Sequence, residues 1–174
     1  MRELADDAKV RAFMRALGNE ARGEGRVYFT GGASAVLIGW RASTIDIDLK
    51  LDPEPPGAFE AIATLKDRLS VNVELAAPDQ FIPPLEGWVE QSRFIERHGA
   101  VDFFHYDFRA QALSKIERGH AQDITDVHQM LAHALVTGEQ LRDAHARLEG
   151  QLIRYPAIDP PAFARKLAMF LEEP

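Results

Sequence analysis

Two aspartates that alternate with aliphatic residues are the first feature of this sequence that could support chemistry. Asp46 and Asp48 lie in the run 44–51, where Ile45, Ile47 and Leu49 occupy the other positions. Successive side chains of a β-strand point to opposite faces, so both carboxylates would share one face, about 7 Å apart along the strand. Like charges this close are stable only in solvent or beside a cation. Because Mg²⁺ is commonly held by one or two carboxylates together with substrate phosphates, the pair predicts a divalent-cation site.

A glycine turn precedes the two aspartates. Gly31 and Gly32 separate a short β-rich run from a short helical run. Glycines let the backbone approach a phosphate closely, and the N-terminus of a helix offers N–H groups to an anion. Ser34 adds a hydroxyl in the first helical turn, and Arg41 could either contact a phosphate or pair with Asp46. The turn therefore predicts a phosphate-binding site, although it matches neither the Walker nor the dinucleotide-binding pattern.

A second alternating run, 71–75, carries another acid. Asn72 and Glu74 would share one face of this strand. If the strand lies beside that of the aspartates, Glu74 adds a third carboxylate, and Asn72 is the alternative for that position. Carboxylates in this number could hold metal ions that activate a hydroxyl and bind a leaving pyrophosphate. Glu74 could equally be a solvated residue at the edge of the sheet.

This combination of motifs resembles the nucleotidyltransferase superfamily with the polymerase-β-like fold. Its pattern is a Gly-Gly or Gly-Ser turn, a helix, paired acids on a strand and a third acid on a later strand. The resemblance implies a nucleoside triphosphate as substrate and Mg²⁺ (or Mn²⁺) as cofactor. The residues to which it gives these roles are Gly31, Gly32 and Ser34 for the phosphates, and Asp46, Asp48 and Glu74 for metal binding and catalysis.

The helical segment ALSKIERGHAQDITDVHQML also resembles a family motif, the K-x-x-R then D-x-x-D segment of abortive-infection-type nucleotidyltransferase toxins. The resemblance implies Lys115 and Asp123 as catalytic residues and Arg118 as a nucleotide contact. It also implies an RNA end or a protein hydroxyl as acceptor, and an antitoxin as a partner. The structural alternatives are a solvated helix face for Lys115 and Arg118, and a helix N-cap for Asp123. Asp126 would suit the helix dipole and receives no functional role.

Positioning these residues requires a mixed α/β core followed by helices. Hydrophobic spacing predicts helices near 10–17, 33–38 and 59–69, strands at 27–30, 44–51 and 71–75, and a hairpin over 94–106. Gly18 is expected to end the first helix. We therefore expect an α/β (α+β) fold, with a nucleotidyltransferase-like mixed sheet and flanking helices in residues 1–106. A C-terminal helical portion packed on this core should occupy residues 107–174, its last helix serving as core or as a partner-binding face.

Composition excludes several classes of protein. The 174 residues include no cysteine, which rules out disulfide scaffolds, thiolate zinc sites and cysteine nucleophiles. The net charge is −7 and neither predicted portion is basic, so a non-specific nucleic-acid coat is excluded, whereas a local basic patch for one nucleotide or RNA end is not. The sequence has no apolar run of about 18 residues and no signal-peptide pattern, which predicts a cytoplasmic protein without a membrane partner.

These observations favour a metal-dependent nucleotidyltransferase that moves a nucleoside monophosphate from a triphosphate to a hydroxyl. The resemblance implies in addition that it is the toxin of a toxin–antitoxin pair. One alternative is a non-catalytic nucleotide-binding regulatory module on the same fold. The other is an interaction protein that acts through its C-terminal helices. The first alternative predicts nucleotide binding without transfer, and the second predicts a complex that does not depend on Asp46 and Asp48.

Overall fold

The computed structural model describes residues 2–172, which divide into two compact units. One unit contains the described residues up to Ala77 together with Ser92–Tyr106, and the other contains Pro78–Gln91 and the described residues from Asp107 onward. The α+β fold class predicted from the sequence is confirmed. The boundary predicted at residue 106 coincides with one passage between the units. The segment Pro78–Gln91, which the sequence analysis placed in the first portion, belongs with the C-terminal helices.

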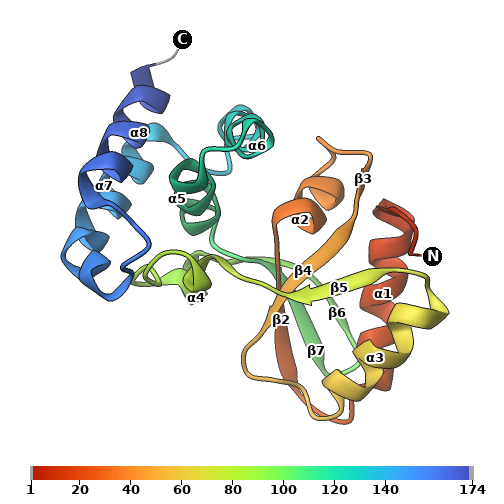
Figure 1. Ribbon diagram of the computed structural model, residues 1–174. Coiled ribbons are helices and arrows are strands. Elements are labelled where there is room, and N and C mark those ends of the chain that lie inside the picture. The colour runs from red at the N-terminus through yellow and green to blue at the C-terminus, as the bar shows by residue number, and fades with distance from the viewer. Residues whose placement is uncertain (1, 173–174) are drawn as a thin grey trace. The chain divides into compact units, whose positions relative to one another are not determined.

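A mixed sheet forms the centre of the first unit (Figure 1). Among residues 2–172 it has five strands, in the order β5-β4-β2-β7-β6. Their bounds are β2 Gly25–Thr30, β4 Asp46–Leu51, β5 Asn72–Leu75, β6 Arg93–His98 and β7 Val101–His105. β2 is antiparallel to β4 and parallel to β7, β4 is parallel to β5, and β6 is antiparallel to β7. The alternation of residues along β4 and β7 gives the sheet one apolar face and one face that carries polar side chains, the polar face, on which Tyr28 and Thr30 of β2 are nevertheless buried.

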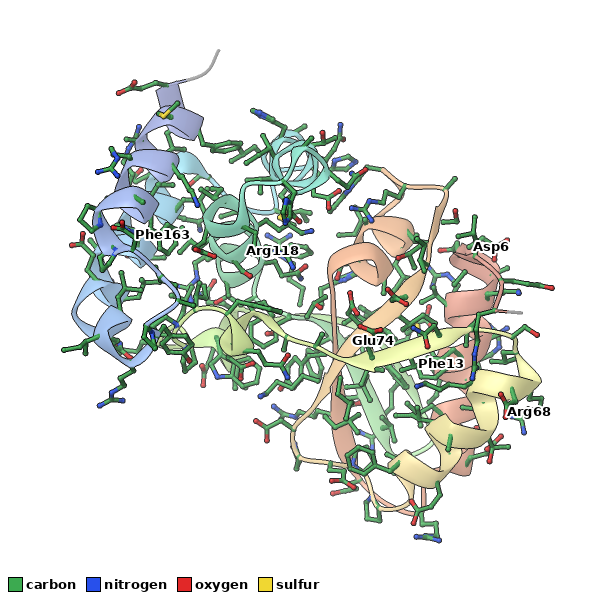
Figure 2. The ribbon with its side chains drawn as sticks, viewed as in Figure 1. Asp6, Phe13, Arg68, Glu74, Arg118 and Phe163 are labelled. Carbon is green, nitrogen blue, oxygen red and sulfur yellow. The ribbon has the colours of Figure 1, made fainter. Side chains whose placement is uncertain are left out.

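Helices α1 (Asp7–Glu20), α2 (Gly31–Ile38) and α3 (Ala58–Arg68) cover the apolar face. α1 begins where the carboxylate of Asp6 accepts a hydrogen bond from the backbone N–H of Lys9, 2.9 Å away. The ring of Phe13 on α1 packs against that of Phe29 on β2, with centroids 6.5 Å apart (Figure 2). Burial of this apolar face and of the apolar helix residues packed against it is the main force that holds the unit together.

Two local expectations were wrong. Ile45 was expected to point the same way as Ile47 and Leu49, but it is 70% exposed while they are completely buried, and it lies between β4 and the short strand β3 (Ser43–Thr44). β3 pairs with β1 (Ala5–Asp6) instead of extending the ladder of β4, so the alternation stops there. Gly18 lies inside α1 rather than at its end. A Cβ at Gly18 would come within 2.4 Å of the backbone oxygen of His98, so this glycine serves close packing against the β6–β7 hairpin.

Helices build the second unit. Their bounds are η1 Pro78–Gln80, α4 Trp88–Gln91, α5 Phe108–Arg118, α6 Ala121–Ala132, α7 Gly138–Leu148, η2 Glu149–Arg154 and α8 Pro160–Glu172. α5 contacts α6, α7 and α8. The apolar residues Phe163, Leu167 and Phe170 of α8 are buried, as expected for core positions. Among the described helices, none is both long enough and apolar enough to cross a bilayer.

Candidate functional site

Three carboxylates of the first unit lie on the polar face of neighbouring strands. The register of β2 and β4 places Thr30 opposite Asp48, and the register of β4 and β5 places Asp48 opposite Glu74 and Asp46 opposite Asn72. The third carboxylate required β4 and β5 to be neighbours, and they are (Figure 1). We call Asp46, Asp48, Asn72 and Glu74 the carboxylate cluster.

The amide of Asn72 connects two of these acids. Its Nδ2 donates to Oδ1 of Asp46 at 2.5 Å and to Oε1 of Glu74 at 3.3 Å. An N–H donor between two carboxylates offsets part of their mutual repulsion. Asn72, the alternative third ligand in the sequence analysis, thus binds the acids themselves, while Glu74 is exposed at the edge strand.

Whether the cluster fits a metal ion depends on how many protein ligands that ion needs. Within residues 2–172, no three His, Cys, Asp or Glu side chains stand close enough together to hold one. Mg²⁺, however, usually takes only one or two carboxylates from the protein, and phosphates and water complete its shell. Asp46 and Asp48 meet this requirement with oxygen ligands, and Glu74 is the neighbour of Asp48 across the strands.

The Gly31–Gly32 turn lies directly beside Asp48. α2 begins at Gly31, whose φ of +54° falls in the left-handed region that favours glycine. A Cβ at Gly31 would lie 3.2 Å from Oδ2 of Asp48, and a Cβ at Gly32 would lie 2.0 Å from Oγ1 of Thr44. The same Gly32 position is 3.3 Å from Nη1 of Arg41, so this guanidinium reaches the first turn of α2. A larger residue at either glycine would therefore collide with the site or strain the backbone.

The hydroxyl of Ser34 faces the interior rather than a ligand. Ser34 is completely buried, and its Oγ donates to the backbone oxygen of Phe29 at 3.3 Å. The same Oγ lies 2.8 Å from Nδ1 of His105 on β7, and the oxygen of Phe29 also accepts from the N–H of Tyr106 at 2.8 Å. These bonds fix the junction between β2 and α2. Phosphate contact at this turn would therefore fall to the backbone N–H groups.

Stability should depend on pH through His105. Burial lowers the pKa of His105 to about 4, with smaller effects from Arg93 and Arg11. In the unfolded chain the imidazole of His105 has a pKa near 6.5, so as the pH falls it binds a proton at a higher pH than in the folded chain. The free energy of unfolding should therefore fall as pH drops from about 6.5 towards 4. At about pH 5 the loss should reach about 2 kcal/mol. Urea unfolding near neutral pH and near pH 5 measures it, and His105→Gln should lose less over the same interval. An identical loss in both proteins would contradict this assignment.

The charged residues predicted in the helical segment form a second cluster, within the second unit. Nζ of Lys115 lies 2.8 Å from Oδ2 of Asp126 and 3.3 Å from Oδ1 of Asp123. Arg118 donates from Nη2 to the same oxygen of Asp123 at 2.8 Å. Lys115 is 6% exposed and Asp126 is completely buried. We call Lys115, Arg118, Asp123 and Asp126 the ion-pair cluster. Each buried charge in it faces an opposite charge, which offsets the cost of removing it from water.

This geometry corrects two structural alternatives. Lys115 is not part of a solvated face, because it is buried between α5 and α6. Asp123 is not the N-cap of α6, since His120 occupies that position and Asp123 lies in the first turn. Arg118 is partly exposed, and its guanidinium lies 5.4 Å from the centroid of the Phe81 ring. Asp126, which had no assigned role, is the closer carboxylate partner of Lys115.

The predicted site residues thus divide between the units. The first unit brings together Gly31, Gly32, Arg41, Asp46, Asp48 and Glu74, and the second brings together Lys115, Arg118 and Asp123. Sequence reasoning missed His105, whose partner Ser34 is 71 residues away in the chain. No local pattern signals a pair at that separation.

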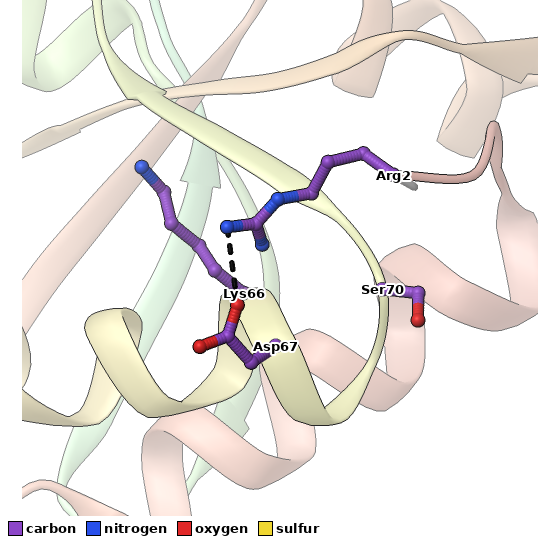
Figure 3. Close-up of a pocket in the computed structure, with 4 residues that line it drawn as sticks. All are labelled: Arg2, Lys66, Asp67 and Ser70. Carbon is purple, nitrogen blue, oxygen red and sulfur yellow. Dashed lines mark ion pairs between the residues drawn. The ribbon is translucent and has the colours of Figure 1, made fainter.

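A pocket in the first unit lies outside this predicted set. It has a volume of about 220 Å³ and is lined by Arg2, Lys66, Asp67 and Ser70 (Figure 3). Arg2 pairs with Asp67 at 3.2 Å, and the carboxylate of Asp67 is largely exposed. The pocket is therefore lined by a solvated ion pair at the end of α3. It contains no residue of the carboxylate cluster, so its shape does not point to that cluster.

Comparison of this chain with protein-family models, with curated proteins and with solved structures finds no match. Function is therefore inferred from the residues and their geometry.

Proposed function

We propose that the protein is a metal-dependent nucleotidyltransferase, which moves a nucleoside monophosphate from a triphosphate to a hydroxyl. The observation that carries the proposal is the position of Asp48, between the Gly31 turn and Glu74, with Asp46 on the same face of the same strand. Phosphoryl transfer requires little covalent chemistry from a protein. It depends on positioning the phosphates and balancing their charge, and adjacent backbone donors and carboxylates can do both.

In this proposal different residues of the first unit bind the phosphates, neutralise their charge and accept the proton of the acceptor hydroxyl. Backbone N–H groups at the start of α2 bind the triphosphate, and Arg41 adds positive charge near the same turn. A divalent cation on Asp46 and Asp48 would supply neutralisation of phosphate charge. A carboxylate of the cluster orients the acceptor hydroxyl and takes its proton. The hydroxyl oxygen bonds to the α-phosphorus, the bond from that phosphorus to the bridging oxygen breaks, and pyrophosphate leaves with the electron pair.

The ion-pair cluster has a separate place in the proposal. Lys115 directs its ammonium group at two carboxylates of its own unit, an arrangement that stabilises the packing of α5 on α6. The catalytic roles that the resemblance implies for Lys115 and Asp123, and the nucleotide contact implied for Arg118, stay predictions. An RNA end or a protein hydroxyl as acceptor, and an antitoxin as partner, also belong to the proposal.

Labelled nucleotide transfer tests the proposal. The purified chain is incubated with each α-³²P-labelled ribonucleoside triphosphate, Mg²⁺ or Mn²⁺, total RNA and cell lysate, beside the double variant Asp46→Ala/Asp48→Ala. A labelled product formed only by the unaltered chain is expected, and its sensitivity to nuclease or protease gives the acceptor class. Equal labelling by the double variant would refute the site.

A second candidate function is nucleotide binding without transfer. The specific observation that favours it is the amide of Asn72, which occupies the space between Asp46 and Glu74 and donates to both. Calorimetric titration of the same triphosphates separates the two candidates. Binding without a labelled product would favour a regulatory module, and the absence of both would remove the nucleotide from either proposal.

A further inference from the structure

Another pocket lies within the second unit, beside the end of α5. Its volume is about 310 Å³, and its lining residues come from three separate parts of the sequence, 80–81, Glu117 on α5 and 154–158. All of these residues belong to the same unit. An apolar cavity of about 150 Å³ is large enough to bind benzene, so this pocket has room for an aromatic ring that carries polar groups.

Hydrogen bonds fix the two loops that form the walls. The hydroxyl of Tyr155 donates to the backbone oxygen of Asp79 at 3.0 Å, which joins one loop to the other. The backbone N–H of Phe81 donates to the oxygen of Pro78 at 2.9 Å and closes the first turn. The N–H of Ile158 donates to the oxygen of Tyr155 at 2.9 Å and closes the second. Walls that are already ordered reduce the entropy that a ligand loses on binding.

Two rings and an aliphatic side chain form the apolar part of the wall. The ring of Phe81 is 40% exposed, and the guanidinium carbon of Arg118 lies 5.4 Å from its centroid. Tyr155 is partly buried and Ile158 is almost completely buried. Contact between aromatic rings is favourable beyond the area that it buries, because the edge of one ring attracts the face of another. The wall therefore favours a ligand with an aromatic side chain.

Two side chains of opposite charge line the pocket without pairing. Among residues 2–172, the carboxylate of Glu117 and the guanidinium of Arg154 form no hydrogen bond or ion pair, either with each other or with another residue. Lys166 donates to the backbone oxygen of Glu117 at 2.6 Å rather than to its carboxylate. A ligand with a single charge would be attracted by one of these groups and repelled by the other, whereas a ligand with both charges pairs with both.

The charged groups around the pocket leave this balance unchanged. Arg118, beside the aromatic wall, is paired with Asp123 at 2.8 Å. Asp159 directly follows the lining segment, but its carboxylate caps the start of α8 by accepting a backbone N–H at 3.2 Å. Neither Asp159 nor Asp79 is among the described residues that line the pocket. The pocket therefore carries one positive and one negative charge.

We propose that this pocket binds a free aromatic α-amino acid, with its carboxylate on Arg154, its ammonium group on Glu117 and its ring against Phe81 and Tyr155. A guanidinium pairs with a carboxylate through two parallel hydrogen bonds, and a carboxylate accepts the N–H groups of an ammonium ion. We call Phe81, Glu117, Arg154 and Tyr155 the amino-acid pocket. This site goes beyond the proposed function and does not depend on it.

Titration of the ¹⁵N-labelled chain with L-phenylalanine, without nucleotide or metal, tests the proposal. Amide resonances of the amino-acid pocket should shift and saturate with a Kd of about 1 mM or lower, as expected for a ligand of about twelve non-hydrogen atoms. L-Leucine, which lacks a ring, should bind about threefold more weakly. The absence of any shift in these resonances at about ten times that concentration would overturn the proposal.

Two derivatives test the charge contacts and distinguish a free amino acid from the end of a peptide. N-Acetyl-L-phenylalanine lacks the ammonium group, as does the C-terminal residue of a peptide, and L-phenylalaninamide lacks the carboxylate, as does the N-terminal residue. Each should bind about tenfold more weakly than L-phenylalanine. A derivative that binds as tightly as the amino acid would refute the zwitterion and identify a peptide end as the ligand.

Variants of the two charged residues assign each contact. Glu117→Gln and Arg154→Gln should each weaken the binding of L-phenylalanine about tenfold. Arg154→Gln should have no further effect on L-phenylalaninamide, and Glu117→Gln should have none on N-acetyl-L-phenylalanine, because the group that each residue binds is already missing. Glu139→Gln and Arg142→Gln, at exposed positions of α7, should leave the affinity unchanged. Equal losses for the amino acid and both derivatives would refute the assigned contacts.

Discussion

Asp48→Asn is expected to lower the rate of nucleotide transfer about a thousandfold. The side chain lies between the Gly31 turn and Glu74, so in the proposed reaction it is the carboxylate nearest both phosphates and acceptor. Asparagine keeps the size of the side chain but removes the charge that would balance a cation. Because charge balance matters most in the transition state, kcat and kcat/KM should fall together, which initial rates over a range of triphosphate concentrations measure.

The control for this prediction is an aspartate remote from any proposed role. Asp67→Asn alters a side chain that is 84% exposed at the end of α3, and it should leave transfer unchanged. Urea unfolding of Asp48→Asn establishes that the variant is folded under the conditions of the transfer assay. Transfer within a few-fold of normal in Asp48→Asn would show that Asp48 is not a catalytic carboxylate.

The shared face of the acids could be predicted from the sequence because two-residue alternation fixes which side chains point together. One apolar face buried against helices specifies the face that each side chain takes, so Asp48 and Glu74 had to share a face once β4 and β5 became neighbours. That neighbourhood follows from the helical crossover α3 between two parallel strands. The same reasoning failed at Ile45, where the chain pairs with another segment and the alternation no longer refers to one sheet.

Contacts between distant residues could not be predicted in the same way. The bond of Ser34 to His105 and the amide bridge from Asn72 depend on strand order and side-chain rotamers, and neither leaves a periodic trace in the sequence. In the helical segment, the spacing predicted that Lys115 and Arg118 share one helix face, but it did not predict which acidic residues they contact. The turn at Gly119, with φ of +72°, reverses the chain and brings Asp126 to Lys115.

Lys115→Met is expected to lower the free energy of unfolding by about 3–5 kcal/mol. The substitution removes the ammonium group and leaves Asp126, which is completely buried, without the cation 2.8 Å away. Urea unfolding followed by circular dichroism measures the change. Arg142→Met, at an exposed arginine of the same unit, should change the free energy of unfolding by less than about 0.5 kcal/mol and serves as the control.

The double variant Lys115→Met/Asp126→Leu separates a structural from a catalytic role for Lys115. Removing both charges abolishes the uncompensated carboxylate, so much of the lost stability should return, because a buried ion pair and a well-packed apolar pair differ little in net free energy. Asp123 keeps Arg118 as its partner at 2.8 Å in this variant. If the cluster acts only through stability, the refolded double variant should transfer nucleotide at a normal rate. A stable double variant with no transfer would instead assign Lys115 or Asp126 to the reaction itself.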